Sequence, residues 1–323
     1  MRDVTIRNMT DEKAVLVTGG AGFIGSHLCA RLLAQEARVI CIDSLITGQM
    51  SNIKRNLTNK RFSFIEGDVR RADTYISLKN IGIDEIYDLA SPASVEYISR
   101  HPVEAATTNS LGTYHLLGLA RSKAARFLFS SSSEVYGDPR EHPQKESYWG
   151  HVNPVGVRSG YDEGKRFGEA IVTAYGREYG MDVRIARIFN TYGPNSSPKD
   201  GRVVPRFITS ALSGKPLPVH GDGTQTRSFC HVDDLVDGLV RLMESNVKTP
   251  VNLGNPEEIR IIDIANMIIR LSKSTSPVAF EKRPVDDPER RMPDITKASE
   301  LLHWQPKVSL SEGLVKTIEY FRK

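Results

Sequence analysis

The sequence has few cysteines and no long apolar run, and both shortages exclude classes of protein. Cys29, Cys41 and Cys230 show neither the pairing of a disulfide framework nor the spacing of metal ligands. No apolar run approaches the roughly 20 residues that span a bilayer, and the polar start MRDVTIRNMTDEK carries no apolar signal segment. We therefore expect a reduced, cytoplasmic protein with no membrane partner.

Charge of one sign is not concentrated anywhere in the chain. The 43 basic and 39 acidic residues are spread along it and give a formal net charge of +4. Without a basic block the sequence does not predict a nucleic-acid partner, although a small anionic ligand is compatible with it. The eight histidines form no cluster with metal-ligand spacing, so we expect no metal.

The chain of 323 residues, 39% of them hydrophobic, is long enough to bury a substantial core. Short β-branched runs alternate with helix-sized amphipathic intervals, which is typical of a Rossmann-type α/β fold with a doubly wound parallel sheet. The six predicted strands lie in AVLVTGG, ARVICID, RFSFIEGD, EIYDLAS, RFLFSSSSEV and VRIARIFN.

The regular alternation of strand-like and helix-like segments ends after about residue 186, where turns rich in Gly and Pro begin. We expect residues 1–185 to form a dinucleotide-binding domain. Residues 186–323 are expected to form mainly a smaller substrate-binding region, partly interleaved with the first domain, at the carboxyl edge where α/β sheets bind ligands.

A glycine-rich turn directly follows the first predicted strand and opens a helix. Glycines at this place allow a tight turn and let a pyrophosphate approach backbone N–H groups at the helix N-terminus. The segment VLVTGGAGFIGSHL therefore predicts a dinucleotide site, whose contact residues we expect to be Gly19, Gly22, Phe23, Ile24 and Gly25.

Two aspartates end the second and third predicted strands. Asp43 follows Gly25 by 18 residues, where a carboxylate accepts hydrogen bonds from an adenosine ribose and repels a 2'-phosphate. The sequence thus favours NAD over NADP. Asp68, at the end of the next strand, is predicted to contact the adenine edge.

Tyr161 and Lys165 stand four residues apart in a predicted helix and so share one face. A lysine ammonium beside a phenol stabilises the phenolate and lowers the tyrosine pKa, which makes tyrosine a usable base near neutral pH. After a nucleotide loop and a hydroxyl-rich strand end, this spacing indicates a catalytic pair.

With these features the sequence resembles the extended short-chain dehydrogenase/reductase family, whose nucleotide-sugar enzymes use Ser or Thr, Tyr and Lys together. The resemblance covers nearly the whole chain. Within the family it is most similar to the UDP-glucuronate decarboxylases, also called UDP-xylose synthases, through SEVYGDP, HPQKESYWG, NPVGVRSGYDEGKR, RIARIFNTYGP, DGRVV, GDGTQTRSF, VDDLV and NLGNPEE.

The resemblance implies a redox-neutral decarboxylation of UDP-glucuronate through a 4-keto sugar, with NAD regenerated in each turn. Tyr161 would be the base at the C4 hydroxyl, and Lys165 would tune its pKa and anchor the nicotinamide ribose. Ser132 would orient the C4 oxygen and Glu134 would lie near C5 and C6. Ser133 is a candidate proton donor at C5.

The resemblance also implies residues that bind the nucleoside diphosphate and a mode of assembly. Asn190, Arg227 and Arg291 are the expected phosphate partners. A guanidinium group can donate two parallel hydrogen bonds to two phosphate oxygens, which favours the arginines in this role. Tyr136 is expected to be a packing or cofactor-wall residue. The family pairs two helices per subunit, here about 104–122 and 161–179, so we expect a homodimer.

Several positions depart from the family pattern. Ser132 stands where threonine is usual, SPASVEY replaces a loop with two prolines, His220 and His231 stand where tyrosine is usual, and Met292 replaces a lysine. These departures bear on the loop geometry and on the substrate.

Three other functions stay open at this stage. ASVEYISRHP is reminiscent of 4-epimerases, so a UDP-glucuronate or UDP-glucose 4-epimerase is the main alternative. A nucleotide-sugar 4,6-dehydratase comes next, although Ser133 stands where many of those enzymes have an aspartate before the glutamate. A non-catalytic NAD-sensing protein would usually lose the tyrosine or the lysine, and both are present.

Overall fold

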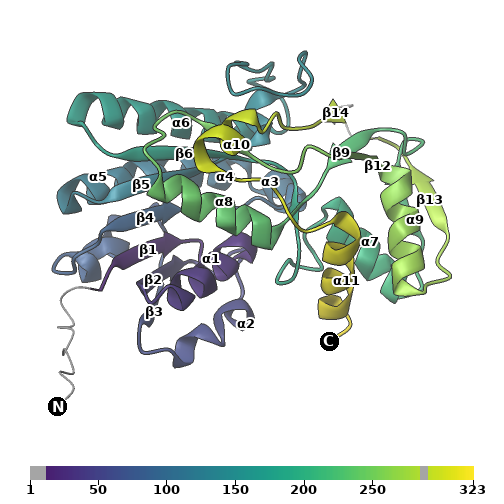
Figure 1. Cartoon of the computed structure of the whole chain (residues 1–323), viewed down its shortest axis with the longest axis horizontal. Coiled ribbons are helices and arrows are strands. Elements are labelled where there is room, and N and C mark those ends of the chain that lie inside the picture. Colours follow the sequence, from purple (N-terminus) through teal and green to yellow (C-terminus); the bar gives the residue numbers. More distant parts are fainter. Residues whose placement is uncertain (1–11, 284–289) are drawn as a thin grey trace.

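Seven parallel strands form the central sheet of the protein (Figure 1). The computed structural model describes residues 12–283 and 290–323, so nearly all of the polar start discussed above lies outside the described residues. In sheet order the strands are β3 (Phe62–Glu66), β2 (Arg38–Asp43), β1 (Ala14–Thr18), β4 (Glu85–Asp88), β5 (Arg126–Ser132), β6 (Val183–Ile188) and β11 (Val251–Leu253).

All six predicted strands are present in this sheet, and the predicted fold class is confirmed. The predicted strand RFLFSSSSEV ends earlier than expected, because Ser133–Tyr136 turns into a short 3-10 helix, η4. The sequence reading missed β11, since three residues are too short to show a period of two.

Apolar side chains on both faces of the sheet are buried, which explains why its strands are continuous apolar runs in the sequence. Val15 and Val17 of β1 pack on the side of α1 (Phe23–Ala34) and α8 (Val232–Glu244). Leu16 between them packs on the opposite side, against α5 (Thr113–Lys123). The helix α6 (Ser159–Tyr179) contributes Val172 to this second core.

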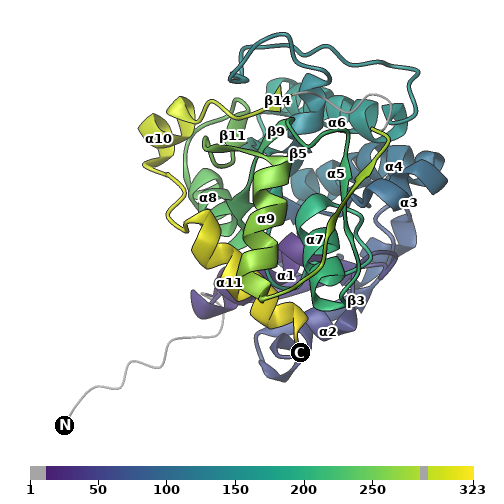
Figure 2. The ribbon, with the colours of Figure 1, turned by 90° about the vertical axis from the view of Figure 1, so that its right-hand side faces the viewer.

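A smaller part of the molecule is built on α7 (Val203–Leu212), α9 (Ile261–Ser272) and α11 (Leu310–Phe321), which pack around a third core (Figure 2). Its short strands form three small sheets: β7 (Thr191–Tyr192) with β10 (Cys230–His231), β8 (Leu217–His220) with β13 (Val278–Glu281), and β9 (Thr226–Ser228) between β12 (Glu258–Arg260) and β14 (Arg290–Arg291).

The remaining helices are short and mostly connect the larger elements. None of the described helices is long and apolar enough to cross a membrane. The short helices are α2 (Met50–Ile53), η1 (Asn56–Thr58), η2 (Ala72–Leu78), α3 (Val95–Arg100), α4 (Pro102–Thr107), the π-turn η3 (Thr108–Gly112) and α10 (Thr296–Leu302).

The strand order reverses between β1 and β4, because the chain first builds β2 and β3 on one side of β1 and then returns to the other side. At such a point the loops after the two strands leave in opposite directions and open a crevice at the carboxyl edge of the sheet. The fold therefore places a ligand site beside the glycine-rich turn that follows β1.

Three glycines spaced four residues apart let α6 lie close to its neighbours. A Cβ on Gly160 would come within 2.7 Å of the Pro102 carbonyl oxygen, and a Cβ on Gly168 within 2.2 Å of Phe129 Cζ in β5. A Cβ on Gly164, between them on the same face, would come within 3.1 Å of Asn109 Cβ. This glycine face fixes α6 against α4, η3 and β5, and so positions the first turns of α6, which carry the predicted catalytic pair.

Gly168→Ala should destabilise the protein by about 1–3 kcal/mol, because the added methyl overlaps the Phe129 ring in a packed core. Gly82→Ala is the control, since no atom lies within 4 Å of its Cβ position and its φ is not positive. That control should change the stability by less than about 0.5 kcal/mol. Urea unfolding of both variants measures the difference, and equal stability would contradict the close α6–β5 approach.

Candidate active site

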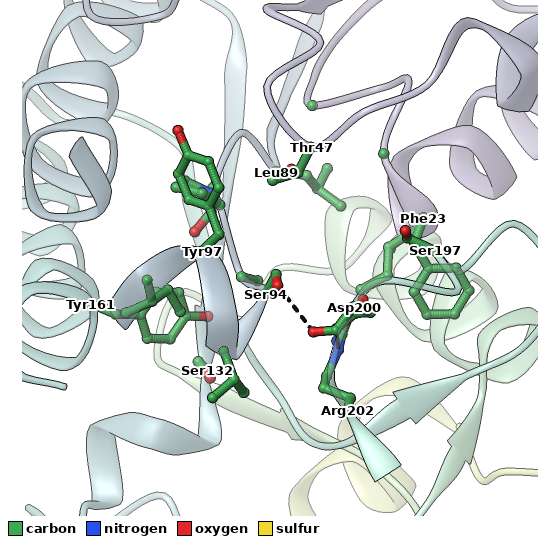
Figure 3. Close-up of a pocket in the computed structure, with 18 of the residues that line it drawn as sticks. Phe23, Thr47, Leu89, Ser94, Tyr97, Ser132, Tyr161, Ser197, Asp200 and Arg202 are labelled. Carbon is green, nitrogen blue, oxygen red and sulfur yellow. Dashed lines mark hydrogen bonds and ion pairs between the residues drawn. The ribbon is translucent and has the colours of Figure 1, made fainter. Parts of the chain in front are cut away.

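One cavity of about 760 Å³ opens at the carboxyl edge of the central sheet (Figure 3). It brings together every residue that the sequence analysis singled out for a site, although these residues come from both halves of the chain. They are Gly19, Gly22, Phe23, Ile24, Gly25, Asp43, Asp68, Ser132, Ser133, Glu134, Tyr161, Lys165, Asn190, Arg227 and Arg291. Within the described ranges no group of three His, Cys, Asp or Glu side chains could hold a metal ion.

The glycine-rich turn has the geometry that a dinucleotide requires. Gly19 has a φ of +69°, a conformation that side chains disfavour. A Cβ on Gly25 would come within 2.2 Å of the Gly19 carbonyl oxygen, so only glycine allows this close crossing of α1 over the turn. The first turn of α1 carries no acidic side chain, which leaves its N–H groups suitable for an anion. The turn thus fits a pyrophosphate.

Asp43 is held at the end of β2 by two backbone groups. Its Oδ2 accepts a hydrogen bond of 2.9 Å from the Ala21 N–H, and its Oδ1 accepts one of 2.8 Å from the Leu45 N–H. Burial raises the pKa of Asp43, and these backbone hydrogen bonds oppose the rise. The carboxylate is therefore fixed in the cavity wall beside the glycine-rich turn, where a ribose of a bound dinucleotide is expected.

Asp68 lines the same end of the cavity, but its carboxylate is engaged within the protein. The Arg70 Nε lies 2.9 Å from Asp68 Oδ2, and the Arg70 Nη2 also donates to Glu104 at 2.7 Å. Burial opposes ionisation of Asp68, and the hydrogen bonds from Arg70 outweigh it and lower the pKa. The segment after β3 is thereby tied to α4.

Tyr161 and Lys165 lie on one face of α6, both buried in the cavity wall. In Figure 3 the Tyr161 hydroxyl points into the cavity near Ser132. The Lys165 Nζ donates a hydrogen bond of 2.7 Å to the Ser130 carbonyl oxygen and lies 5.8 Å from the centre of the Tyr161 ring. Burial lowers the pKa of Lys165 to about 8, opposed by the charge of Asp88.

The structure differs here from the expected lowering of the Tyr161 pKa. Burial raises that pKa to about 12, opposed by the interaction with the Ser132 hydroxyl and reinforced by the charge of Glu134. Burial of the phenol is the main cause, and the Lys165 ammonium does not offset it because it is directed at the Ser130 carbonyl and not at the phenol oxygen.

Glu134 is an ionised carboxylate held between two guanidinium groups. Its Oε1 accepts from Arg291, and its Oε2 lies 2.9 Å from Arg158 Nη2. Burial opposes ionisation, but the charges of Arg291 and then Arg158 outweigh it and lower the pKa of Glu134. The Glu134 N–H also donates to Ser132 Oγ at 3.2 Å, which links Glu134 to the hydroxyl that interacts with Tyr161.

Arg158 is a cavity residue that the sequence analysis missed. It stands at the start of α6, three residues before Tyr161, and lies 4.0 Å from Asp162 as well as contacting Glu134. Asp162 Oδ1 is buried without a hydrogen-bond partner, and burial together with the Glu134 charge raises the Asp162 pKa to about 7. The spacing of Arg158 from Tyr161, less than one helical turn, was the signal available in the sequence.

Two of the predicted phosphate partners come from adjacent strands of one small sheet. Arg227 of β9 pairs in register with Arg291 of β14, so both cations face the cavity from the same wall. Asn190 follows β6 and also lines the cavity. Arg202, which the sequence analysis did not name, lies across the cavity from Tyr161 and is paired with Asp200 (Figure 3).

Tyr136 lies outside this cavity and is a packing residue. It is fully buried, its hydroxyl donates to Asn252 Oδ1 at 2.7 Å, and it accepts from Arg187 Nη1 at 2.9 Å. Of the two histidines that replace family tyrosines, His220 lines the cavity and His231 is buried against Tyr192.

A dinucleotide-binding turn, a buried tyrosine–lysine pair and a cationic wall in one cavity define a class of Rossmann-type enzymes that act through a bound nicotinamide cofactor. Residues 15–254 match the model described as the NAD dependent epimerase/dehydratase family. The chain belongs to this family.

Similar proteins cover almost the whole chain. UDP-glucuronic acid decarboxylase 1 of Xenopus tropicalis is 50% identical over 313 residues, which cover 97% of this chain and 73% of that protein. UDP-glucuronic acid decarboxylase 3 of Arabidopsis thaliana is 49% identical over 309 residues, which cover 95% of this chain and 89% of that protein.

Solved structures share the fold at lower identity. A UDP-glucuronic acid 4-epimerase from Bacillus cereus, in complex with UDP-glucuronic acid and NAD, superposes with a TM-score of 0.85 at 32% identity, covering 96% of this chain and 99% of that one. A UDP-glucose 4-epimerase from Thermotoga maritima, with UDP-glucose, has a TM-score of 0.89 at 30% identity, covering 96% and 98%.

NAD should bind more tightly than NADP, because the fixed Asp43 carboxylate would face the 2'-phosphate with like charge at a cost of about 1 kcal/mol or more. Titration of both cofactors measures the difference. Glu66→Gln is the control, since Glu66 pairs in register with Asp43 at the end of the adjacent strand but does not line the cavity, and it should leave the preference unchanged. Equal affinities for the two cofactors would remove Asp43 from this role.

Proposed function

We propose that this protein decarboxylates UDP-glucuronate to UDP-xylose and carbon dioxide, with NAD regenerated in each turnover. The observation that carries the proposal is the ionised Glu134, held by Arg291 and Arg158 beside Ser132 and Tyr161. It stands in a chain that is half identical to UDP-glucuronic acid decarboxylases and about one third identical to the UDP-glucuronic acid 4-epimerase.

The first step in this proposal is oxidation at the sugar C4. Tyr161 takes the proton of the C4 hydroxyl, while the Ser132 hydroxyl orients the C4 oxygen. Bound NAD supplies a reversible hydride acceptor. Lys165 contributes a positive charge on the Tyr161 side of the cavity and binds the nicotinamide ribose. The raised pKa of Tyr161 implies that the phenol gives up its own proton only as positive charge gathers beside it.

The second step breaks the C5–C6 bond. The C6 carboxylate is then β to a ketone, so its electrons pass through C5 to the C4 oxygen, which Tyr161 and Ser132 stabilise. The fixed charge of Glu134 opposes the substrate carboxylate until it leaves as neutral carbon dioxide. Protonation at C5, with Ser133 or a donor ordered by Glu134 as the source, and return of the hydride complete the turnover.

The other predicted site residues take binding roles in this proposal. Asn190, Arg227 and Arg291 contact the diphosphate side of the substrate, with Arg291 shared between it and Glu134. At the opposite end, the glycine-rich turn with Asp43 and Asp68 binds the dinucleotide. This assigns residues 1–185 to the cofactor and 186–323 mainly to the substrate, although β11 of the second part completes the large sheet and α8 packs on one face of it.

Two variants separate the half-reactions. Tyr161→Phe lacks the C4 base, so we expect it to bind UDP-glucuronate but to lose about 10²–10⁴-fold in transient NADH formation and in carbon dioxide release. Glu134→Gln keeps the C4 machinery, so NADH should accumulate toward one equivalent while UDP-xylose forms slowly. Absorbance of NADH and mass analysis of the sugar nucleotide measure both steps.

Glu163→Gln is the matched control for loss of a carboxylate, because Glu163 lies on α6 outside the cavity. It should behave like the parent. A Glu134→Gln variant that makes UDP-xylose at the parent rate would show that Glu134 has no part in the later step. If UDP-glucuronate is converted to an isomer of unchanged mass, the protein is an epimerase and the proposal is wrong.

We further propose that the protein is a cytoplasmic homodimer. Apolar side chains that a monomer leaves in water gather on the helices expected to pair. Leu111 and Tyr114, on η3 and the adjoining α5, are each 49% exposed, and Phe167 on α6 is 47% exposed. The predicted helix 104–122 is in fact three consecutive elements, α4, η3 and α5, and η3 and α5 both contact α6.

Sedimentation at micromolar concentration should therefore show a dimer. Phe167→Glu places a charge in the expected helix interface and should shift the protein toward monomer. Val315→Glu is the control, since Val315 is exposed on α11 in the other part of the molecule, and it should leave the dimer intact. A monomeric parent protein, or equal effects of the two substitutions, would contradict this interface.

A further inference from the structure

The buried carboxylate of Asp88 ends β4 behind the wall of the cavity and has a well-defined set of partners. Its Oδ2 accepts from Thr113 Oγ1 at 2.8 Å, and its Oδ1 accepts from Thr18 Oγ1 at 3.1 Å. The Thr18 oxygen already accepts from the Ala90 N–H, so its own hydrogen is directed at Asp88. Both carboxylate oxygens are thus acceptors, which is the arrangement of an ionised group.

Asp88 has no cation at salt-bridge distance among the described residues, although it is only 3% exposed. Lys165 is a buried cation in a similar position: the residue is 2% exposed, and its ammonium donates to a neutral carbonyl. The Ser130 carbonyl accepts from Lys165 Nζ, and the Ser130 hydroxyl donates 2.7 Å to the main-chain carbonyl of Asp88. Asp88 also pairs in register with Phe129 on the neighbouring strand, and Lys165 Nζ lies 5.0 Å from the centre of the Phe129 ring. The two buried charges therefore both lie beside the same stretch of β5.

A buried charge without a partner is costly, so opposite charges close together in a protein interior stabilise each other's ionised forms. We propose that Asp88 is a positioning residue that keeps Lys165 ionised and so maintains the cation on the cofactor side of the cavity. The inference deepens the proposed function, since it rests on Lys165 as a cofactor contact.

The electrostatics of the surrounding groups agree with this assignment. Asp88 is the group whose charge raises the pKa of Lys165 against the effect of burial, and the Lys165 charge in turn opposes the burial-driven rise of the Asp88 pKa. The other titratable groups nearby face one member of the pair: Tyr75 and, beyond it, His115 on the Asp88 side, and Tyr161 with Glu134 and Asp162 on the Lys165 side.

The sign of the effect follows from this pairing. With the Asp88 charge removed, the Lys165 ammonium loses its stabilising partner and its pKa falls further below about 8. The cation is then lost at lower pH. Any property that needs the ammonium, such as cofactor affinity, should therefore begin to decline at a lower pH than in the parent protein.

The affinity of the protein for NADH provides the test, because it needs no sugar substrate. Binding is followed by fluorescence between about pH 6 and about pH 9.5, a range that covers the lysine pKa. The variants are Asp88→Asn, which removes the charge at constant size, and Thr113→Val. Thr113→Val removes a hydrogen bond to the same carboxylate and keeps its charge.

For the parent protein, NADH affinity should fall as the pH rises through about 8. In Asp88→Asn this fall should begin about one pH unit or more lower, the usual effect of deleting one nearby opposite charge. Thr113→Val should keep the parental profile. Lys165→Arg, whose guanidinium stays charged, should lose the alkaline fall.

Three results would overturn the proposal. These are coincident profiles for the parent and Asp88→Asn, an equal displacement in Thr113→Val, and an alkaline fall that persists in Lys165→Arg. If Asp88→Asn does not fold, Asp88→Ser takes its place. It removes the same charge with a smaller side chain, and its alkaline fall in NADH affinity should likewise begin at lower pH than that of the parent. Because no UDP-sugar is present, the result stands apart from the decarboxylation test.

Discussion

The close contact between α6 and β5 is the constraint on which the rest of the site depends. Gly168 allows it, since any side chain there would overlap Phe129. Because α6 is a single rigid helix, this contact places Arg158, Tyr161 and Lys165 together relative to the hydroxyls that end β5. A displacement of this helix would separate the tyrosine from Ser132 and the arginine from the glutamate at once, so packing and chemistry are set by the same few atoms.

The cavity is organised by buried charges that are satisfied in different ways. Glu134 is held by guanidinium groups in direct contact, whereas the Lys165 ammonium donates to the Ser130 carbonyl and the Asp88 carboxylate accepts from two threonine hydroxyls. The first arrangement fixes an anion for the later chemistry on the sugar. The second leaves the ammonium facing the cavity, free of a carboxylate that would neutralise it. Hydride transfer and carbon–carbon cleavage thus meet separate electrostatic environments within one cavity.

Local signals predicted the architecture, the cofactor-binding residues and the Tyr161–Lys165 pair: strand runs, a glycine-rich turn and a helical spacing of four. The remaining cavity residues were predicted only through the family resemblance. The sequence did not predict pairings between distant residues. Glu134 and Arg291 are 157 positions apart, so nothing in either segment indicates their contact. The wrong direction expected for the Tyr161 pKa has the same origin. Spacing shows that Lys165 shares a helix face with the tyrosine, but only the fold shows that its ammonium turns toward Ser130.

The outermost strand of the large sheet has a consequence for how the protein is made. β11 pairs with β6, yet the chain builds the whole of α7 and α8 between them. During synthesis the edge of β6 therefore stays unpaired while the segment from β7 to α8 is being made, and an open strand edge is a template for wrong pairing. The nascent chain can complete the seven-stranded sheet only when residues close to Leu253 have left the ribosome, so the cofactor-binding half cannot complete its sheet before α7 and α8 have been made.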